Sequence, residues 1–196
     1  ATRHGSELYH VGDETEAPRY APECEVILGA FPPAVCAAAP GLRWVQSFST
    51  GMDKFLFPEI VAREEVMISN VAGLYASQGA EHAWALLLAL TRRLPEALHN
   101  KDKKVWASGP VVELAGCTLG LIGLGGFGIE MAKRAQGYNM TILAIDPVRT
   151  EKPDYVAELK PTTRENLHDL LRRSDVVMTA CPLTQETYHL ISQDEL

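Results

Sequence analysis

The sequence has 196 residues, enough for one large domain or two small ones with a buried core. Hydrophobic residues make up 46% and charged residues 22%, and the net charge of −7 argues against a nucleic-acid or anionic-membrane binder, since both need a basic surface. No apolar run reaches the roughly 18–20 residues of a membrane span, and the first residues lack the apolar stretch of a signal peptide.

The cysteines are Cys24, Cys36, Cys117 and Cys181. They form no Cys-x-x-Cys pair, which argues against a zinc site, and a disulfide framework is not typical of a chain this long. We therefore expect no metal and a reducing, cytoplasmic setting.

Three short apolar runs predict buried strands at 24–30, 43–49 and 65–70, each ended by turn-forming residues. Between them, 31–41 and 56–65 are proline-containing links that favour short helices or irregular chain. Strands separated by such links predict a parallel sheet.

The segment 77–98 carries the longest helical signal. One apolar face is made by Ala80, Trp84, Leu87, Leu88 and Thr91. Ser77 is the expected N-cap, Arg92 and Arg93 lie near the helix C-terminus, and Pro95 breaks or restarts the helix. We interpret the face as core or subunit-interface packing.

A polar stretch followed by glycine and proline, 100–116, predicts a domain boundary, and an alternation of strands and helices follows it. The predicted strands are 118–124, 140–145, 155–159 and 175–180. A helix over 127–136 should end at Gly137, and a second should be opened by a capping box of Thr162 and Glu165. In a doubly wound sheet, the last strand would lie beside the first.

Residues 123–128 read G-x-G-x-x-G between a predicted strand and a predicted helix. Gly123 permits the sharp turn, Gly125 lets a diphosphate approach the backbone, and Gly128 lets the helix pack against the strand. The helix N-terminus then presents free N–H groups near Gly126 and Phe127 to an anion. A methyltransferase carries similar loops, and a purely structural turn needs glycines too, but the context favours a dinucleotide site.

The second strand of this unit ends at Asp146, where a carboxylate can accept hydrogen bonds from both ribose hydroxyls. The same charge would repel a 2′-phosphate, so NAD is favoured over NADP. Arg149 is the one feature that points toward NADP.

These motifs, in this order, resemble the NAD-dependent D-isomer-specific 2-hydroxyacid dehydrogenase family. The resemblance rests on "LRWVQSFSTGMD", "ISNVAGLYASQGAEHAWALLLALTRR", "GLIGLGGFG" with "AIDP", and "ACPLTQETYHLIS". It implies a substrate loop whose amides hold a carboxylate and three further cofactor-facing segments. The residues implied are Thr50, Gly51 and Met52 for substrate, and Val71, Cys181, Pro182 and Thr187 for cofactor, beside the glycines and Asp146.

The resemblance also implies a fold and a domain plan. Residues 1–101 would form part of a flavodoxin-like substrate-binding domain, and residues 102–196 the first part of a Rossmann-like NAD-binding domain with a doubly wound parallel sheet. The overall class is α/β. A homodimer is implied as well, built on the nucleotide-binding domain.

The family's general acid/base histidine, its glutamate partner and its substrate-binding arginine follow the Pro-Leu-Thr segment, so we expect them beyond Leu196. We also expect the family's first strand and helix to lie before this chain, which would make it part of a longer dehydrogenase. The histidines present are His4, His10, His82, His99, His168 and His189, and none receives a catalytic role.

Two functions follow from this reading. The first is hydride transfer between NAD(H) and a small D-2-hydroxy acid or 2-oxo acid. The second is a non-catalytic NAD(H)-binding regulatory or scaffold protein on the same fold, which turnover assays would distinguish.

Overall fold

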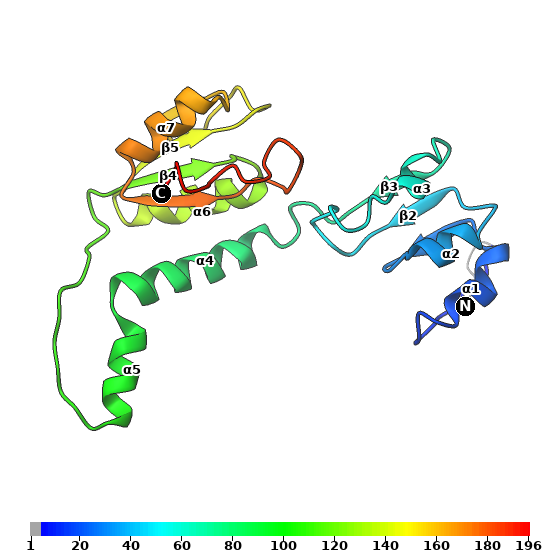
Figure 1. Ribbon diagram of the computed structural model, residues 1–196, viewed down its shortest axis with the longest axis horizontal. Helices are drawn as coiled ribbons and strands as arrows, with labels where there is room; N and C mark the ends of the chain where they lie inside the picture. The colour runs from blue at the N-terminus through cyan, green and yellow to red at the C-terminus, as the bar shows by residue number, and fades with distance from the viewer. Residues whose placement is uncertain (1–4) are drawn as a thin grey trace. The chain divides into compact units, whose positions relative to one another are not determined.

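The computed structural model describes residues 5–196, so His4 lies outside the described residues. The chain divides into two compact units, Ala1–Ala72 and Gly73–Leu196. Each unit is built on its own parallel sheet with helices between the strands (Figure 1). The α/β class expected from the sequence is confirmed.

The first unit contains a three-stranded parallel sheet in the order β1-β2-β3. Its elements are α1 (Ala17–Tyr20), η1 (Ala21–Glu23), β1 (Val26–Leu28), α2 (Pro33–Ala37), β2 (Trp44–Gln46), α3 (Pro58–Val61) and β3 (Met67–Ser69). Prolines begin both linking helices, where a fixed φ and a missing N–H cost nothing. All three predicted strands and both predicted links are confirmed.

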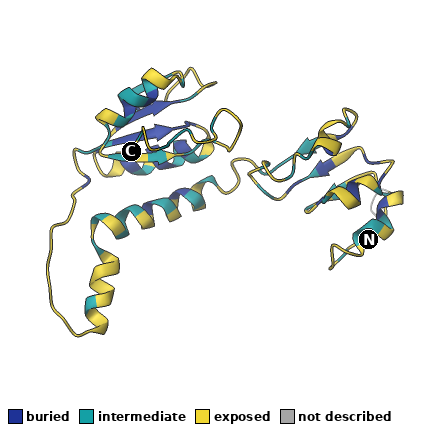
Figure 2. Cartoon of the chain, viewed as in Figure 1, coloured by how far each residue is buried: buried dark blue, intermediate teal, exposed yellow. Residues whose placement is uncertain are grey.

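The sequence predicts buried strands here, and the structure buries one face of each strand only. Val45 lies inside the core at the centre of the sheet, flanked by Ile27 and Ile68 in the neighbouring strands. Trp44 and Met67, one residue earlier in their strands, belong to the other face by the alternation of a strand and are exposed. Figure 2 shows exposed as well as buried residues in the strands of this unit. An apolar run alone does not reveal whether a second layer covers the sheet, because buried and exposed apolar residues look alike in sequence.

The second unit contains a four-stranded parallel sheet in the order β6-β5-β4-β7. Its elements are α4 (Ala76–Thr91), α5 (Leu94–Asp102), β4 (Thr118–Ile122), α6 (Gly126–Gly137), β5 (Thr141–Ile145), β6 (Glu158–Lys160), α7 (Arg164–Arg173) and β7 (Val176–Thr179). β7 pairs with β4, as the doubly wound order predicts. From β4 the chain adds β5 and then β6 on one side, and β7 is added on the other side of β4. The strand order of the sheet therefore reverses between β4 and β7.

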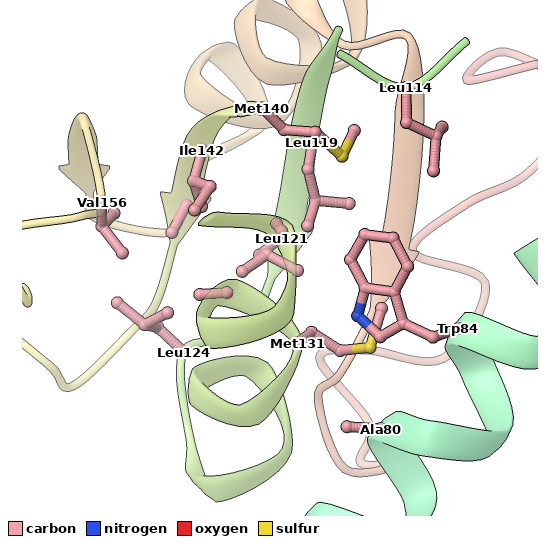
Figure 3. Packing of buried hydrophobic residues seen from close by; sticks show 13 residues of the cluster. Ala80, Trp84, Leu114, Leu119, Leu121, Leu124, Met131, Met140, Ile142 and Val156 are labelled. Carbon is pink, nitrogen blue, oxygen red and sulfur yellow. The ribbon is translucent and has the colours of Figure 1, made fainter. Parts of the chain in front are cut away.

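Helices cover both faces of this sheet. On one face, Trp84 from α4 and Met131 from α6 pack against Leu119 and Leu121 of β4 (Figure 3). On the opposite face, Ile122 and other residues of β4 and β5 pack against α7. This two-sided burial explains why β4 and β5 read as continuous apolar runs.

Two helix ends differ from the sequence prediction. The N-cap of α4 is Tyr75 rather than Ser77, and the Ser77 hydroxyl instead accepts a hydrogen bond from Arg134 at 2.9 Å. Gly137 lies inside the last turn of α6, and the left-handed residue beyond that turn is Asn139 with φ 54°. Asparagine tolerates this conformation better than most residues, so glycine was not required.

The start of α7 lies one residue later than predicted. Thr163 is the N-cap, and its hydroxyl accepts a hydrogen bond from the Asn166 amide at 3.1 Å. The capping box of Thr162 and Glu165 does not form. Adjacent threonines offer two equivalent N-caps in sequence, and only the packing of the helix selects one.

No helix in the described part of the chain combines the length and the apolarity that crossing a membrane requires.

Candidate functional site

A cleft of about 1000 Å³ lies at the carboxyl ends of β4, β5 and β7. Ligands of open α/β sheets bind at this edge, where the strand order reverses. The cleft brings together residues that lie up to 73 positions apart, from Ile122 to Glu195. The sequence-predicted residues that line it are Gly123, Gly125, Asp146, Cys181, Pro182 and Thr187.

The three fingerprint glycines meet three different physical demands. Gly123 has φ +99°, and a Cβ there would lie 2.9 Å from the Ala180 carbonyl. A Cβ on Gly128 would lie 2.3 Å from the Gly123 carbonyl oxygen, so both positions need glycine for backbone packing. Gly125 has ordinary extended φ and ψ, and a Cβ there would meet no atom within 4 Å. Of the three glycines, only Gly125 could carry a Cβ without a clash inside the protein.

Gly125 is also the N-cap of α6, so the first amides of that helix follow it directly. Helix geometry leaves these N–H groups without partners in the helix and gives its N-terminus a partial positive charge. The Phe127 ring points away from the cleft, because it packs against Gly79 of α4, where a Cβ would lie 2.8 Å from the ring. Gly126 and Phe127 can therefore contact a ligand in the cleft only through their backbone N–H groups.

Asp146 has its carboxylate fixed by three backbone N–H groups. Oδ2 accepts from Leu124 at 2.8 Å, and Oδ1 accepts from Val148 at 2.9 Å and Arg149 at 2.8 Å. Partial burial raises the pKa of Asp146, but these three hydrogen bonds outweigh burial and hold the pKa below its ordinary value. A carboxylate has about four acceptor positions, so only about one remains for a ribose hydroxyl.

The far wall of the cleft is the turn that follows β7. The Thr187 hydroxyl donates to the Pro182 carbonyl at 2.6 Å and accepts from the Thr184 amide at 2.8 Å. Burial raises the pKa of the Cys181 thiol. This thiol therefore stays protonated at neutral pH and is a small, weakly polar part of the wall.

Side-chain contacts of Glu195 connect the end of that wall to α7. The buried Glu195 carboxylate accepts from the Ser192 hydroxyl at 2.6 Å and lies 3.1 Å from Nε2 of His168. The hydrogen bond from the Ser192 hydroxyl has the largest effect, the contact with His168 adds to it, and the pKa of Glu195 is lowered to about 2. Arg164 lies nearby, 3.9 Å from the same carboxylate. The two histidines noted near this wall, His168 and His189, thus have structural or cleft-lining positions.

Several residues that line the cleft are not predicted from the sequence. Thr162, Thr163 and Arg164 belong to it because they follow the carboxyl end of β6. Their place in the cleft could have been predicted, since residues that follow the carboxyl ends of parallel strands lie at one edge of the sheet. Glu195 was missed because nothing in its immediate sequence predicts the contact with His168.

The predicted substrate loop lies in the first unit, after β2. Thr50 and Gly51 are exposed, whereas Met52 packs against the core of that unit and anchors the loop. The Asn70 side chain donates a hydrogen bond to the Thr50 carbonyl at 2.9 Å. The Val71 amide donates to the Ser49 carbonyl at 3.4 Å. Val71 therefore lies beside the loop, and Asn70 supports the loop although the sequence did not predict this role.

Among residues 5–196, no three histidine, cysteine, aspartate or glutamate side chains are grouped as a metal site. All four cysteines are unpaired.

Comparisons with a family model and with known proteins identify the same family for this chain. Residues 84–196 match the model described as "D-isomer specific 2-hydroxyacid dehydrogenase, NAD binding domain". The glyoxylate reductase of Thermococcus gammatolerans is 38% identical over 167 residues, which are 81% of this chain and 49% of that protein. The glyoxylate reductase of Korarchaeum cryptofilum is 37% identical over 168 residues, 83% of this chain and 49% of that protein.

Solved structures agree with this result. A D-isomer specific 2-hydroxyacid dehydrogenase family protein from Aeromonas salmonicida matches with TM-score 0.81 and 25% identity, covering 93% of this chain and 58% of that one. D-lactate dehydrogenase from Aquifex aeolicus matches with TM-score 0.75 and 22% identity, covering 91% and 54%, and this likeness concerns the fold. The chain spans about half the length of the curated relatives it matches, 49% in both cases above.

Proposed function

The chain belongs to the D-isomer specific 2-hydroxyacid dehydrogenase family, and from this premise we propose that the protein is an oxidoreductase. It transfers a hydride between NAD(H) and a small D-2-hydroxy acid or 2-oxo acid. The cofactor supplies the hydride, and the protein supplies binding, orientation and electrostatics.

The observation that carries the proposal is the cleft at the carboxyl ends of β4, β5 and β7. It places an open glycine, a helix N-terminus and a fixed carboxylate along one surface. Its volume of about 1000 Å³ is sufficient for a dinucleotide, since ligand pockets range from about 300 to 1,000 Å³. The residues present thus fit the NAD expected from the family.

Each part of the cleft has a proposed task. The amides at the start of α6, with Gly126 and Phe127, bind the diphosphate, and Gly125 allows its approach. Asp146 accepts a hydrogen bond from the adenosine ribose and disfavours a 2′-phosphate, which makes NADP the less favoured cofactor. Cys181, Pro182 and Thr187 form the wall beside the dinucleotide.

In the first unit, we propose that the loop amides of Thr50, Gly51 and Met52 bind the substrate carboxylate. Amides around a glycine can form an anion-binding concavity without any charged side chain. Val71 is proposed as a cofactor-facing residue. The arginine, glutamate and histidine of the reaction are expected beyond Leu196, and no described histidine is proposed as the proton donor.

The substrate class rests on the relatives, which are named glyoxylate reductase. Glyoxylate is therefore the first 2-oxo acid to test, followed by hydroxypyruvate. We also propose a cytoplasmic homodimer in which residues 1–101 serve as the substrate-binding domain and 102–196 as the NAD-binding domain. The free cysteines are compatible with a reducing compartment.

The experiment follows NADH oxidation by its near-ultraviolet absorbance, with glyoxylate or hydroxypyruvate as the acceptor. The proposal predicts turnover with NADH that exceeds turnover with NADPH. Tight NADH binding without turnover on any 2-oxo acid would contradict the enzyme assignment and favour the regulatory protein.

A further inference from the structure

The carboxyl edge of the first sheet is formed by the segments that follow its three parallel strands. These segments are 29–30 after β1, 47–52 after β2 and 70–72 after β3. Ligands of open α/β sheets bind outside the carboxyl ends of the strands, and the amides proposed to bind the substrate carboxylate belong to this edge. A small 2-oxo acid held there by its carboxylate reaches only side chains that lie close to the loop 50–52.

Phe48 is the large apolar side chain next to this loop. It lies two residues before Thr50 and is 60% exposed. Of the five phenylalanines in the chain, Phe48 alone is exposed. Phe55 and Phe57 of the same unit pack against Phe31 in its core. Apolar surface that is left in water favours contact with an apolar group of a ligand.

Contacts with the sheet fix the position of Phe48. The preceding residue, Ser47, is buried, and its amide donates a hydrogen bond to the Ser69 carbonyl at 2.8 Å. The Ser47 hydroxyl accepts one from the Ser49 amide at 3.1 Å. The Phe48 ring lies against Gly29, where a Cβ would be 3.5 Å from Cε2 of the ring. The ring is therefore supported on one side and accessible on the rest of its surface.

The carboxyl edge carries no ionisable side chain. Residues 29–30, 47–52 and 70–72 are apolar residues, glycines, serines, a threonine and an asparagine. Asp53 and Lys54, which follow the loop, have opposite charges. An anionic group at the distal end of a substrate would lose hydration beside Phe48 without gaining a cation, which is unfavourable. The edge therefore favours a 2-oxo acid whose distal end is apolar.

We propose that Phe48 is a specificity-determining residue. Its ring contacts the substrate beyond the 2-oxo group and favours a short apolar side chain over a second anionic group. The inference rests on the proposed function, which places the substrate carboxylate on the loop amides, and goes beyond it by naming the preferred side chain. Glyoxylate has no side chain to make this contact. In contrast, 2-oxobutyrate offers a methyl group where oxaloacetate offers a second carboxylate.

The test compares kcat/KM for glyoxylate, 2-oxobutyrate and oxaloacetate, with NADH as the hydride donor, in the protein and four variants. Phe48→Ala removes the ring, Phe48→Leu keeps an apolar side chain, and Phe48→Arg places a cation at the same position. Val61→Ala is the matched control, since Val61 lies on α3 and is 58% exposed. Denaturant unfolding establishes that each variant is folded.

The unaltered protein and Val61→Ala should prefer 2-oxobutyrate to oxaloacetate. Phe48→Ala should lower the ratio of kcat/KM for 2-oxobutyrate to that for glyoxylate by about tenfold or more, since one methylene in an apolar pocket changes kcat/KM by roughly 10–200-fold. Phe48→Leu should retain most of this ratio. Phe48→Arg should shift the preference toward oxaloacetate, because the new cation pairs with the second carboxylate.

Two kinds of failure are distinguishable. Turnover with the same substrate ratios in all three Phe48 variants, or an equal change in Val61→Ala, would overturn the role of Phe48 and leave the proposed function standing. A preference of the unaltered protein for oxaloacetate would also overturn that role. No turnover of any 2-oxo acid by the unaltered protein would refute the proposed function, and this inference with it.

Discussion

Substituting Gly125 by alanine should separate ligand binding from stability. The added Cβ meets no protein atom within 4 Å, and the backbone φ of −73° is favourable for alanine. We therefore expect the free energy of unfolding to stay the same or to rise by about 0.4–1 kcal/mol, because alanine restricts the unfolded chain more than glycine does.

The same Cβ should weaken NADH binding because it enters the cleft where the diphosphate is proposed to lie. Losing one charge-assisted hydrogen bond costs about 1.5–3 kcal/mol, which corresponds to roughly tenfold to hundredfold weaker binding. The assay is a titration of tryptophan fluorescence with NADH, combined with denaturant unfolding of the same sample.

Two matched glycine-to-alanine variants serve as controls. A Cβ on Gly137 also meets no atom within 4 Å, so Gly137→Ala should stabilise α6 by about 1 kcal/mol and leave binding intact. Gly123→Ala imposes φ +99° on alanine and should lower stability by about 1–3 kcal/mol. If Gly125→Ala bound NADH as tightly as Gly137→Ala does, the proposed diphosphate position would be wrong.

Asp146→Asn should loosen the backbone turn after β5 and weaken NADH binding about tenfold, while NADPH binding falls less; equal losses for the two cofactors would contradict the role of the charge. Thr163→Ala should cost about 1 kcal/mol of stability in denaturant unfolding, whereas Thr162→Ala should cost much less, and the reverse order would refute the observed N-cap. The pKa of Glu195 is lowered from 4.5 to about 2, so its contribution to stability is present above pH 4.5 and is lost as the pH falls toward 2. The stability difference between the unaltered protein and Glu195→Gln should therefore shrink over this range in pH-dependent unfolding, and a constant difference would count against the contact.

The strands and their order were predictable from the sequence because β4 and β5 are buried on both faces. Their continuous apolar runs and the glycines that follow admit few other structures. The first unit was less predictable, since the exposed Trp44 and Met67 follow the same apolar pattern as buried residues. Which face of a sheet is covered depends on distant segments, and local sequence carries no record of it.

Part of the cleft was predictable for the same reason. Gly123, Gly125 and Asp146 follow strands whose carboxyl ends must meet, and the structure brings them together. The three amides that bind the Asp146 carboxylate were not foreseen, because they come from two separate turns. Nor was the contact of Glu195 with His168, which joins residues 27 positions apart.

The most direct test of the central claim is a crystal structure of the protein with bound NAD. We expect the diphosphate beside Gly125 at the start of α6, with the adenosine ribose within hydrogen-bond distance of Asp146. A dinucleotide bound away from the carboxyl ends of β4 and β5, with this cleft empty, would contradict this expectation.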